Sequence, residues 1–412
     1  MNAVPRRRGW CPSLYEPMET GDGLLVRVHP PGARLLASAA CALADAAARW
    51  GNGAIELTRR GNLQVRGLGP DGVGPFAAAM VAAGLADPDP ARERRRVVIA
   101  PPLAGDDPGA GPMGLAERIE AALAGGPALA SKFCIAVDAG GVLAGRTVPA
   151  DILVQVEGSG DRLLGNGFDL ACAWDRTVDQ VLRLVGWADG KRLVSLSLRE
   201  RVGVREAASW EAGLVGPAPS QEGAALAASL TPTLSRRERE QEQTSIIGWH
   251  PYPGAANGAL ALGLPVGQLD AAALRVLAEL SERFSEGALR TSPFRALLLG
   301  RVRAADVLAA CRAAEAAGFV TDPADSRLLV TSCVGAPGCA SATVPARQDA
   351  IRLANEGAGR LHVSGCAKGC AYPGAGPALV GAAGHYTLMP DWRPGLEPVS
   401  GLDATPGLEP NS

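Results

Sequence analysis

The stretch Cys333-Val-Gly-Ala-Pro-Gly-Cys339, followed by Gly365-Cys366-Ala-Lys-Gly-Cys370, places four of the nine cysteines in two pairs near the end of a 412-residue chain. Each pair follows a run of apolar and β-branched residues, at 328–331 and at 361–364, and is embedded in small residues. This pattern predicts two strands that end in tight glycine turns and present their thiols to a shared point.

Four thiolates at such a point can hold an iron–sulfur cluster or zinc. Structural zinc usually takes C-x2-4-C pairs, and only the second pair falls in that range. A [4Fe-4S] cluster is larger, and the glycines and alanines between the cysteines leave room for inorganic sulfide. The spacing therefore favours a [4Fe-4S] cluster, with zinc and four unliganded core thiols as the alternatives.

Composition narrows the class of protein. With 47% apolar residues and few aromatics, the chain is long enough for two or three domains with cores of Ala, Leu and Val. A net charge of −2 argues against nucleic acid as a partner. The odd cysteine count and the lack of an apolar run of membrane-spanning length predict a cytoplasmic protein with no membrane partner. Because no nucleotide-binding glycine motif is present, electrons from NAD(P)H would arrive through a separate electron-donor reductase.

One order of elements is expected twice along the chain. A strand at 23–29, a helix at 33–50, extended pieces within 54–67 and a helix at 72–84 are matched by segments at 258–265, 270–284, 287–299 and 303–317. The alignment puts Gly53 against Gly287 and Pro30-Pro-Gly32 against Pro265-Val-Gly267. We interpret this as an internal duplication, with chance similarity of two units as the alternative. A duplicated unit tends to form a pseudo-twofold interface, where large cofactors are commonly held.

Three basic segments are candidates for binding an anion: Thr58–Arg66, Arg92–Arg96 and Lys132. Arginines that alternate along a strand point to one face, and a guanidinium binds a carboxylate through two hydrogen bonds. A tetrapyrrole with many carboxylates would need such a set, although a basic run can also be ordinary solvated surface.

These residues resemble the nitrite and sulfite reductase family, whose members hold a [4Fe-4S] cluster beside an iron tetrapyrrole. The resemblance implies that Cys333, Cys339, Cys366 and Cys370 ligate the cluster, with Cys370 in the place of the thiolate that bridges to the sirohaem iron. Segments 57–64, 95–98 and 132–134 are similar to the family's L-T-x-R-Q-x-x-Q, R-N-V and K-F-K motifs.

The family motifs imply residue roles. They imply Arg60, Arg95 and Lys132 as catalytic residues, while Cys134 stands where the family has a second lysine. The residues expected to bind substrate are Arg27, Arg59, Asn62, Gln64, Arg66, Arg96 and Lys368, with Arg96 also the alternative register for Arg95.

Within that family, the segments Lys132–Gly141 and Ile247–Pro251 are similar to the precorrin-3B synthase branch. This resemblance implies an O2-dependent monooxygenase of aerobic cobalamin biosynthesis, which hydroxylates precorrin-3A and closes a lactone. The alternatives are a sirohaem-dependent nitrite or sulfite reductase and a non-catalytic iron–sulfur or zinc protein. A second mononuclear iron or a sirohaem-like tetrapyrrole, and thus haem binding, stays open, and none of the four histidines is assigned as a ligand: His29, His250, His362 and His385.

The expected fold class is α+β, with two duplicated ferredoxin-like half-repeats and nitrite/sulfite-reductase-type α/β domains around the [4Fe-4S] site. The expected units are a first half-repeat (20–90), a first α/β domain (91–210), a linker or insertion (211–244), a second half-repeat (245–318), a second α/β part with the cysteines (319–390) and a flexible tail (391–412).

Overall fold

The computed structural model describes residues 11–395 except for 111–113, 127–128, 131, 147, 149, 158–159, 166–167, 173–175, 191–245 and 373–375. The predicted linker at 211–244 lies outside the described residues, as does the tail from 396. Among the described helices, none has the length and apolar character needed to cross a membrane.

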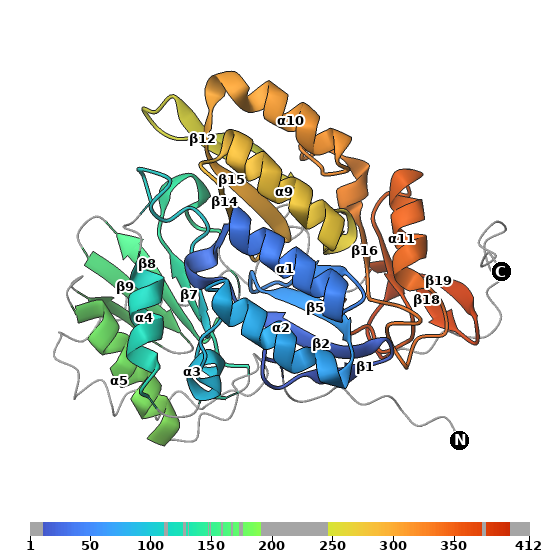
Figure 1. Cartoon of the computed structure of the whole chain (residues 1–412), viewed down its shortest axis with the longest axis horizontal. Coiled ribbons are helices and arrows are strands. Elements are labelled where there is room, and N and C mark those ends of the chain that lie inside the picture. The colour runs from blue at the N-terminus through green and yellow to red at the C-terminus, as the bar shows by residue number, and fades with distance from the viewer. Residues whose placement is uncertain are drawn as a thin grey trace.

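The first half-repeat is a five-stranded antiparallel sheet with helices on one face (Figure 1). Along the sheet, the strands are β1 (Met18–Thr20), β2 (Gly23–Val28), β5 (Leu63–Leu68), β4 (Ala54–Leu57) and β13 (Gln268–Asp270). The covering helices are α1 (Ala37–Trp50) and α2 (Pro70–Ala82). Alternate residues such as Val26, Ile55 and Val65 are fully buried in the core shared with these helices. Because side chains alternate along a strand, the residues between them face the opposite side.

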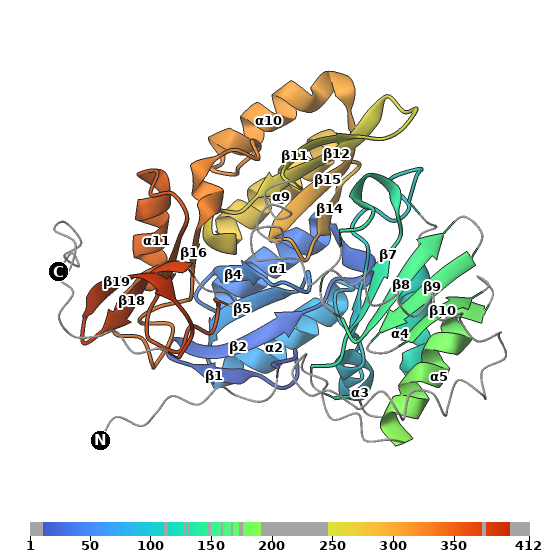
Figure 2. The same ribbon diagram turned by 180° about the vertical axis from the view of Figure 1, so that it is seen from behind.

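The second half-repeat has the same construction. Its strand order is β11 (Gly248–Pro251), β12 (Asn257–Gly263), β15 (Ala296–Arg303), β14 (Ala288–Thr291) and β3 (Arg34–Leu36). Its helices are α9 (Ala271–Phe284) and α10 (Val307–Ala316), and α9 packs beside α1 (Figures 1 and 2). Each half-repeat gives one short strand to the other sheet: β3 pairs with β14, and β13 pairs with β4. The two halves therefore form one unit.

The structure corrects the expected start of the first helix. The helix was expected at 33–50 but begins at Ala37, because 31–33 form a 3-10 turn and 34–36 form the exchanged strand β3. Pairing with β14 overrides the helical tendency of these residues.

The alignment of the two copies is wrong by one residue at the proline motif. The 3-10 turns Pro31–Ala33 and Pro265–Gly267 occupy the same place, so Pro31 rather than Pro30 corresponds to Pro265. The left-handed residues agree with this register, since φ is 56° at Gly32 and 51° at Val266.

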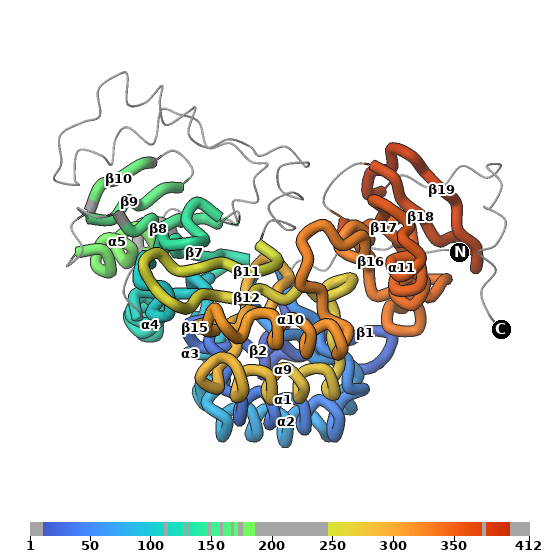
Figure 3. Tube along the Cα trace, turned by 90° about the horizontal axis from the view of Figure 1, so that it is seen from above, coloured from blue at the N-terminus to red at the C-terminus, as the bar shows by residue number. Residues whose placement is uncertain are grey.

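Two further sheets flank the half-repeats on opposite sides (Figures 2 and 3). The first contains β6 (Val98–Ile99), β7 (Ile135–Asp138), β8 (Ile152–Glu157), β9 (Gly160–Gly165) and β10 (Phe168–Cys172), with α3 (Pro90–Arg94), α4 (Leu115–Leu123) and α5 (Thr177–Gly190) nearby. The other contains β16 (Val330–Ser332), β17 (Leu361–Ser364), β18 (Gly376–Ala382) and β19 (His385–Trp392), with helix α11 (Ala346–Asn355). The expected α+β class with a duplicated half-repeat is confirmed, while the boundaries of the units stay predictions.

Candidate active site

The two cysteine pairs lie in loops that follow two neighbouring parallel strands. Strand β16 leads into Cys333 and β17 leads into Cys366, and the strands pair with Ser332 opposite Val363. The carboxyl ends of parallel strands meet at one edge of a sheet, so the loops meet there as well. The N–H of Gly365 donates to the Sγ of Cys333 over 3.1 Å. The sequence prediction of strands that deliver both pairs to one place is consistent with this arrangement.

The thiols are close enough to act on one another. Burial raises the pKa of Cys366, and the nearby thiols of Cys333, Cys339 and Cys370 raise it further. Within the described part of the chain, no group of three or more His, Cys, Asp or Glu residues is placed to hold a metal ion.

The loops accept only small residues at their crowded points. Gly335 has a φ of 70°, and a Cβ there would lie 2.4 Å from the backbone nitrogen of Ala346. A Cβ on Gly365 would lie 2.6 Å from the Cβ of Ala342. The backbone N–H of Lys368 also acts on Cys366, lowering its pKa against burial. Such N–H groups stabilise thiolates and set cluster potentials, so these loops fit an iron–sulfur cluster.

A polar row crosses the face of the first sheet that lies away from α1 and α2. Arg27, Gln64 and Glu56 stand on β2, β5 and β4 as direct register partners. The Nη2 of Arg27 donates to Gln64 Oε1 over 2.7 Å, and Gln64 Nε2 donates to Glu56 Oε2 over 3.1 Å. Burial lowers the pKa of Arg27, whose Nε has no hydrogen-bond partner among the described residues. The structure thus brings together two predicted residues, Arg27 and Gln64.

Arg66 connects this sheet to the first cysteine loop. Its Nη2 donates to the carbonyl oxygen of Gly338 over 2.6 Å and to Asp22 Oδ1 over 2.9 Å. Although burial opposes it, hydrogen bonds from Arg66 and Thr20 hold the pKa of Asp22 below its ordinary value. The guanidinium predicted to bind substrate is therefore engaged with the loop.

Arg60 and Lys132 meet at the edge of the same face. The Nη2 of Arg60 donates to the carbonyl oxygen of Lys132 over 2.5 Å, while the side chain of Lys132 is exposed. Burial raises the pKa of the nearby Cys134 thiol, and the Asp151 carboxylate accepts its backbone N–H over 2.9 Å. Arg60 acts electrostatically on Cys134 and on Arg27, which places it beside the polar row.

Arg95 and Arg96 make hydrogen bonds outside this face. Arg95 Nη1 donates to the carbonyl oxygens of Ala91 and Ala124, over 3.0 and 3.2 Å. Arg96 donates to the carbonyl oxygen of His29 and pairs with Glu93 and Glu120 at the junction with the first α/β sheet. Their roles in catalysis and substrate binding stay predictions, as do those of the exposed Arg59 and the buried Asn62.

Sequence reasoning missed several charged residues at this site. Glu56 accepts a hydrogen bond from Arg347 Nη2 over 2.5 Å, and Asp22 binds Arg66. Burial lowers the pKa of Arg295 to about 10, with Arg59 and Arg347 close by. Of these residues, only Glu56 could have been placed from the sequence, because it alternates with the apolar Ile55 and Leu57 on a predicted strand. Arg347 lies on a helix whose sequence gives no sign of its partner.

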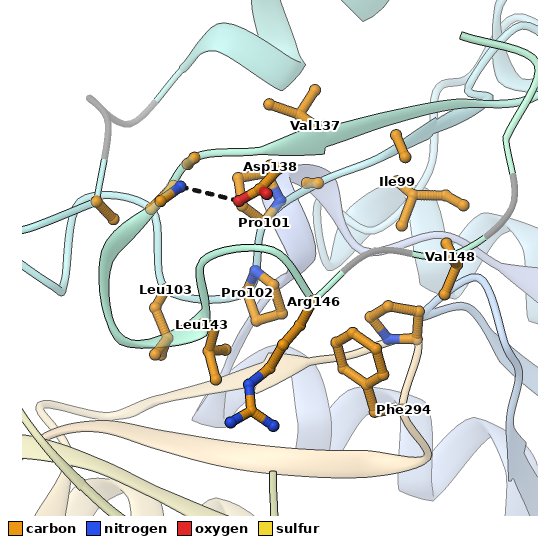
Figure 4. A pocket seen from close by; sticks show the side chains of 17 residues that line it. Ile99, Pro101, Pro102, Leu103, Val137, Asp138, Leu143, Arg146, Val148 and Phe294 are labelled. Atoms are coloured by element: carbon orange, nitrogen blue, oxygen red, sulfur yellow. Dashed lines mark hydrogen bonds between the residues drawn. The ribbon is translucent and has the colours of Figure 1, made fainter. Parts of the chain in front are cut away.

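A cavity elsewhere is too small for a large ligand. It measures about 30 Å³ and lies between the first α/β sheet and the turn from β14 to β15, where Phe294 and Arg146 border it (Figure 4). The Asp138 carboxylate at its rim accepts the N–H of Gly140 over 3.0 Å. Its narrow interior has room for water-sized molecules and not for a tetrapyrrole.

Comparisons with known proteins agree with this geometry. The family model described as the nitrite/sulfite reductase ferredoxin-like half domain matches residues 16–83 and 252–317, which lie in the two half-repeats. A precorrin-3B synthase from Sinorhizobium sp is 34% identical over 93% of this chain and 83% of that protein. A ferredoxin–nitrite reductase from Synechococcus elongatus is 25% identical over 89% of this chain and 77% of its own length.

The solved structure of Mycobacterium tuberculosis NirA protein has a TM-score of 0.61 and covers 89% of this chain and 73% of that one. At 16% identity this likeness shows the fold alone. The identity to the Sinorhizobium protein along nearly the whole chain is what decides the family. The chain belongs to the family that joins the precorrin-3B synthases with the nitrite and sulfite reductases, and it is an oxidoreductase.

Proposed function

We propose that this oxidoreductase is an O2-dependent monooxygenase that hydroxylates precorrin-3A and closes a lactone. The observation that carries the proposal is the pairing of a four-cysteine site with a face lined by guanidinium groups, in a chain related to a precorrin-3B synthase. One oxygen atom enters the tetrapyrrole and the other leaves as water, so each turnover needs two electrons and two protons from an external donor.

Cys333, Cys339, Cys366 and Cys370 would hold a [4Fe-4S] cluster. When bound, the cluster supplies one-electron transfer. The protein's part is to surround the thiolates with backbone N–H groups, such as that of Gly365 to Cys333, and to keep side chains out of the space that sulfide needs.

The cationic face would bind the carboxylates of the tetrapyrrole. Arg27 is anchored through Gln64, which fixes the direction of its guanidinium group. Arg60 is held by the carbonyl of Lys132, whose exposed ammonium group can reach solvent or substrate. Guanidinium groups fixed in this way bind carboxylates with little loss of side-chain entropy.

The second candidate is a sirohaem-dependent nitrite or sulfite reductase, favoured by the similarity to a nitrite reductase. A buried thiol whose pKa is raised, Cys134, is a poor group for holding a small inorganic anion. The monooxygenase is therefore the better reading of this face.

The test is anaerobic purification followed by visible spectroscopy, iron and sulfide analysis, and an assay with precorrin-3A, O2 and an artificial electron donor. We expect four sulfides per chain, no sharp tetrapyrrole bands and formation of a hydroxylated lactone. Arg60→Gln should lower kcat/KM at least about tenfold with the cluster retained, while Arg303→Gln on an exposed surface pair serves as the control. A sirohaem spectrum with nitrite turnover would replace this proposal by the reductase.

A further inference from the structure

Glu56 lies at the point where the cationic sheet meets the segment that follows the first cysteine pair. Its Oε1 accepts from Arg347 Nη2 over 2.5 Å, and Arg66 Nη1 lies 3.8 Å from the same oxygen. Its Oε2 accepts from Gln64 Nε2 over 3.1 Å. The side chains of Glu56 and Arg347 are each 16% exposed, so water screens this pair only in part.

Arg347 occupies a place where a cation is disfavoured without a partner. It lies in the first turn of α11, and the helix dipole puts partial positive charge there. Its Nε is buried and has no hydrogen-bond partner among the described residues. Glu56, 291 residues away in the sequence, supplies the compensating charge.

The first turn of α11 is packed tightly against the first cysteine loop. The N–H of Ala336 donates to the carbonyl of Val344 over 2.9 Å, and Gly335 leaves no room for a Cβ beside Ala346. Arg347 is also close enough for its charge to act on Cys333. A contact that holds Arg347 in place therefore also holds the first cysteine loop in place.

Glu56 has a second effect, in the direction of the polar row. By accepting from Gln64 Nε2, it orients the amide so that Gln64 Oε1 faces Arg27, which donates to it over 2.7 Å. A reversed amide would turn an N–H toward the guanidinium and lose that hydrogen bond.

We propose that Glu56 is a positioning residue that fixes the first cysteine loop through Arg347 and the guanidinium of Arg27 through Gln64, and that it balances the charge of Arg347 beside Cys333. The inference deepens the proposed function. It rests on that proposal only for the identity of the groups that the loop and the guanidinium bind.

The first test measures amide hydrogen exchange of the anaerobically purified protein. Glu56→Gln keeps the shape of the side chain but removes its charge, and Asp306→Asn, on an exposed pair far along the chain, is the matched control. We expect exchange to be several-fold faster across 335–350 in Glu56→Gln and in Arg347→Gln, and unchanged in Asp306→Asn. Unchanged exchange in both variants would overturn the proposal, whether or not a cluster is bound.

The second test measures the midpoint potential of the cluster by EPR-monitored titration. Removing an anion should raise the potential in Glu56→Gln, and removing a cation should lower it in Arg347→Gln. A role limited to loop packing would shift both potentials in the same direction, and that result would overturn the charge-balancing role. If the wild-type protein holds no cluster, the proposed function fails, and hydrogen exchange alone decides this inference.

Discussion

Arg66 and Gly338 are 272 positions apart in the sequence, yet Nη2 of Arg66 donates a 2.6 Å hydrogen bond to the carbonyl oxygen of Gly338, next to Cys339. The N–H of Gly21 donates to the same oxygen over 3.2 Å. One carbonyl thus joins the turn between β1 and β2, the middle of β5 and the first cysteine loop. The four-cysteine site is built on the first half-repeat as well as on its own sheet.

Replacing Arg66 should destabilise this junction. Arg66→Gln removes the ion-pair partner of the Asp22 carboxylate, which keeps only neutral hydrogen-bond donors, and should lower the free energy of unfolding by about 3 kcal/mol. Arg66→Lys should recover only part of the loss, because an ammonium group cannot reproduce the forked contact with Asp22 and Gly338. Urea denaturation and sulfide content check this, with Arg303→Gln as the control. Equal stability and full sulfide content in Arg66→Gln would contradict the assignment.

A methyl group at Gly335 should disturb the site by steric conflict. In Gly335→Ala the new Cβ would lie 2.4 Å from the nitrogen of Ala346, at a φ of 70°. We expect a loss of about 3 kcal/mol and weaker retention of iron and sulfide.

Gly357→Ala is the matched control for this prediction. Gly357 has a φ of 77°, but a Cβ there meets nothing within 4 Å. Its variant should lose only about 1 kcal/mol, the cost of the backbone conformation. If the two variants were equally stable, close packing of the loop against α11 would not be the reason for Gly335.

The sequence predicts best what depends on neighbouring residues. The alternation of Arg27 with Val26 and Val28 is enough to place its side chain opposite the core. The runs before Cys333 and Cys366 predict the strands β16 and β17 for the same reason. The order of elements likewise predicts the duplicated half-repeats.

What the sequence does not predict depends on contacts between distant segments. Glu56 and Arg347 look like surface charges until the fold brings them together over 2.5 Å. Arg96 looks like part of a substrate-binding run, but the fold surrounds it with carbonyl and carboxylate acceptors. The residues of strand β3 were expected to be helical. Their pairing partner, β14, lies in the other half-repeat, so the local sequence does not indicate a strand. No local pattern records these pairings.

Glu120 should make stability depend on pH near neutrality. Burial raises its pKa to about 7, against the opposing effect of Arg96 and with help from Glu93 and Glu117. The folded protein therefore binds this proton more tightly than the unfolded chain. Its contribution is fully present below the unfolded pKa of about 4.5 and is lost as the pH rises through about 7.

The adjacent His29 acts in the opposite direction. Burial, and then the positive charge of Arg96, lowers its pKa to about 3. Its contribution to stability is present above about 6.5 and falls as the pH decreases toward 3. Measurements on the wild type alone would sum the two effects, so the Glu120 contribution needs a variant that keeps His29.

Glu120→Gln is that variant, since it removes the titrating group and preserves its size. At pH 5.5 it should unfold at the same urea concentration as the wild type or a higher one, because the neutral amide avoids the cost of ionising a buried carboxylate. Between pH 5.5 and pH 8 the advantage of Glu120→Gln in free energy of unfolding should grow by on the order of 2 kcal/mol, because the wild-type carboxylate must ionise while buried. Glu356→Gln, on an exposed pair with Arg352, provides the control for a surface carboxylate. A difference between wild type and Glu120→Gln that stays constant from pH 5.5 to pH 8 would show that Glu120 is ionised throughout, held by Arg96 despite its burial.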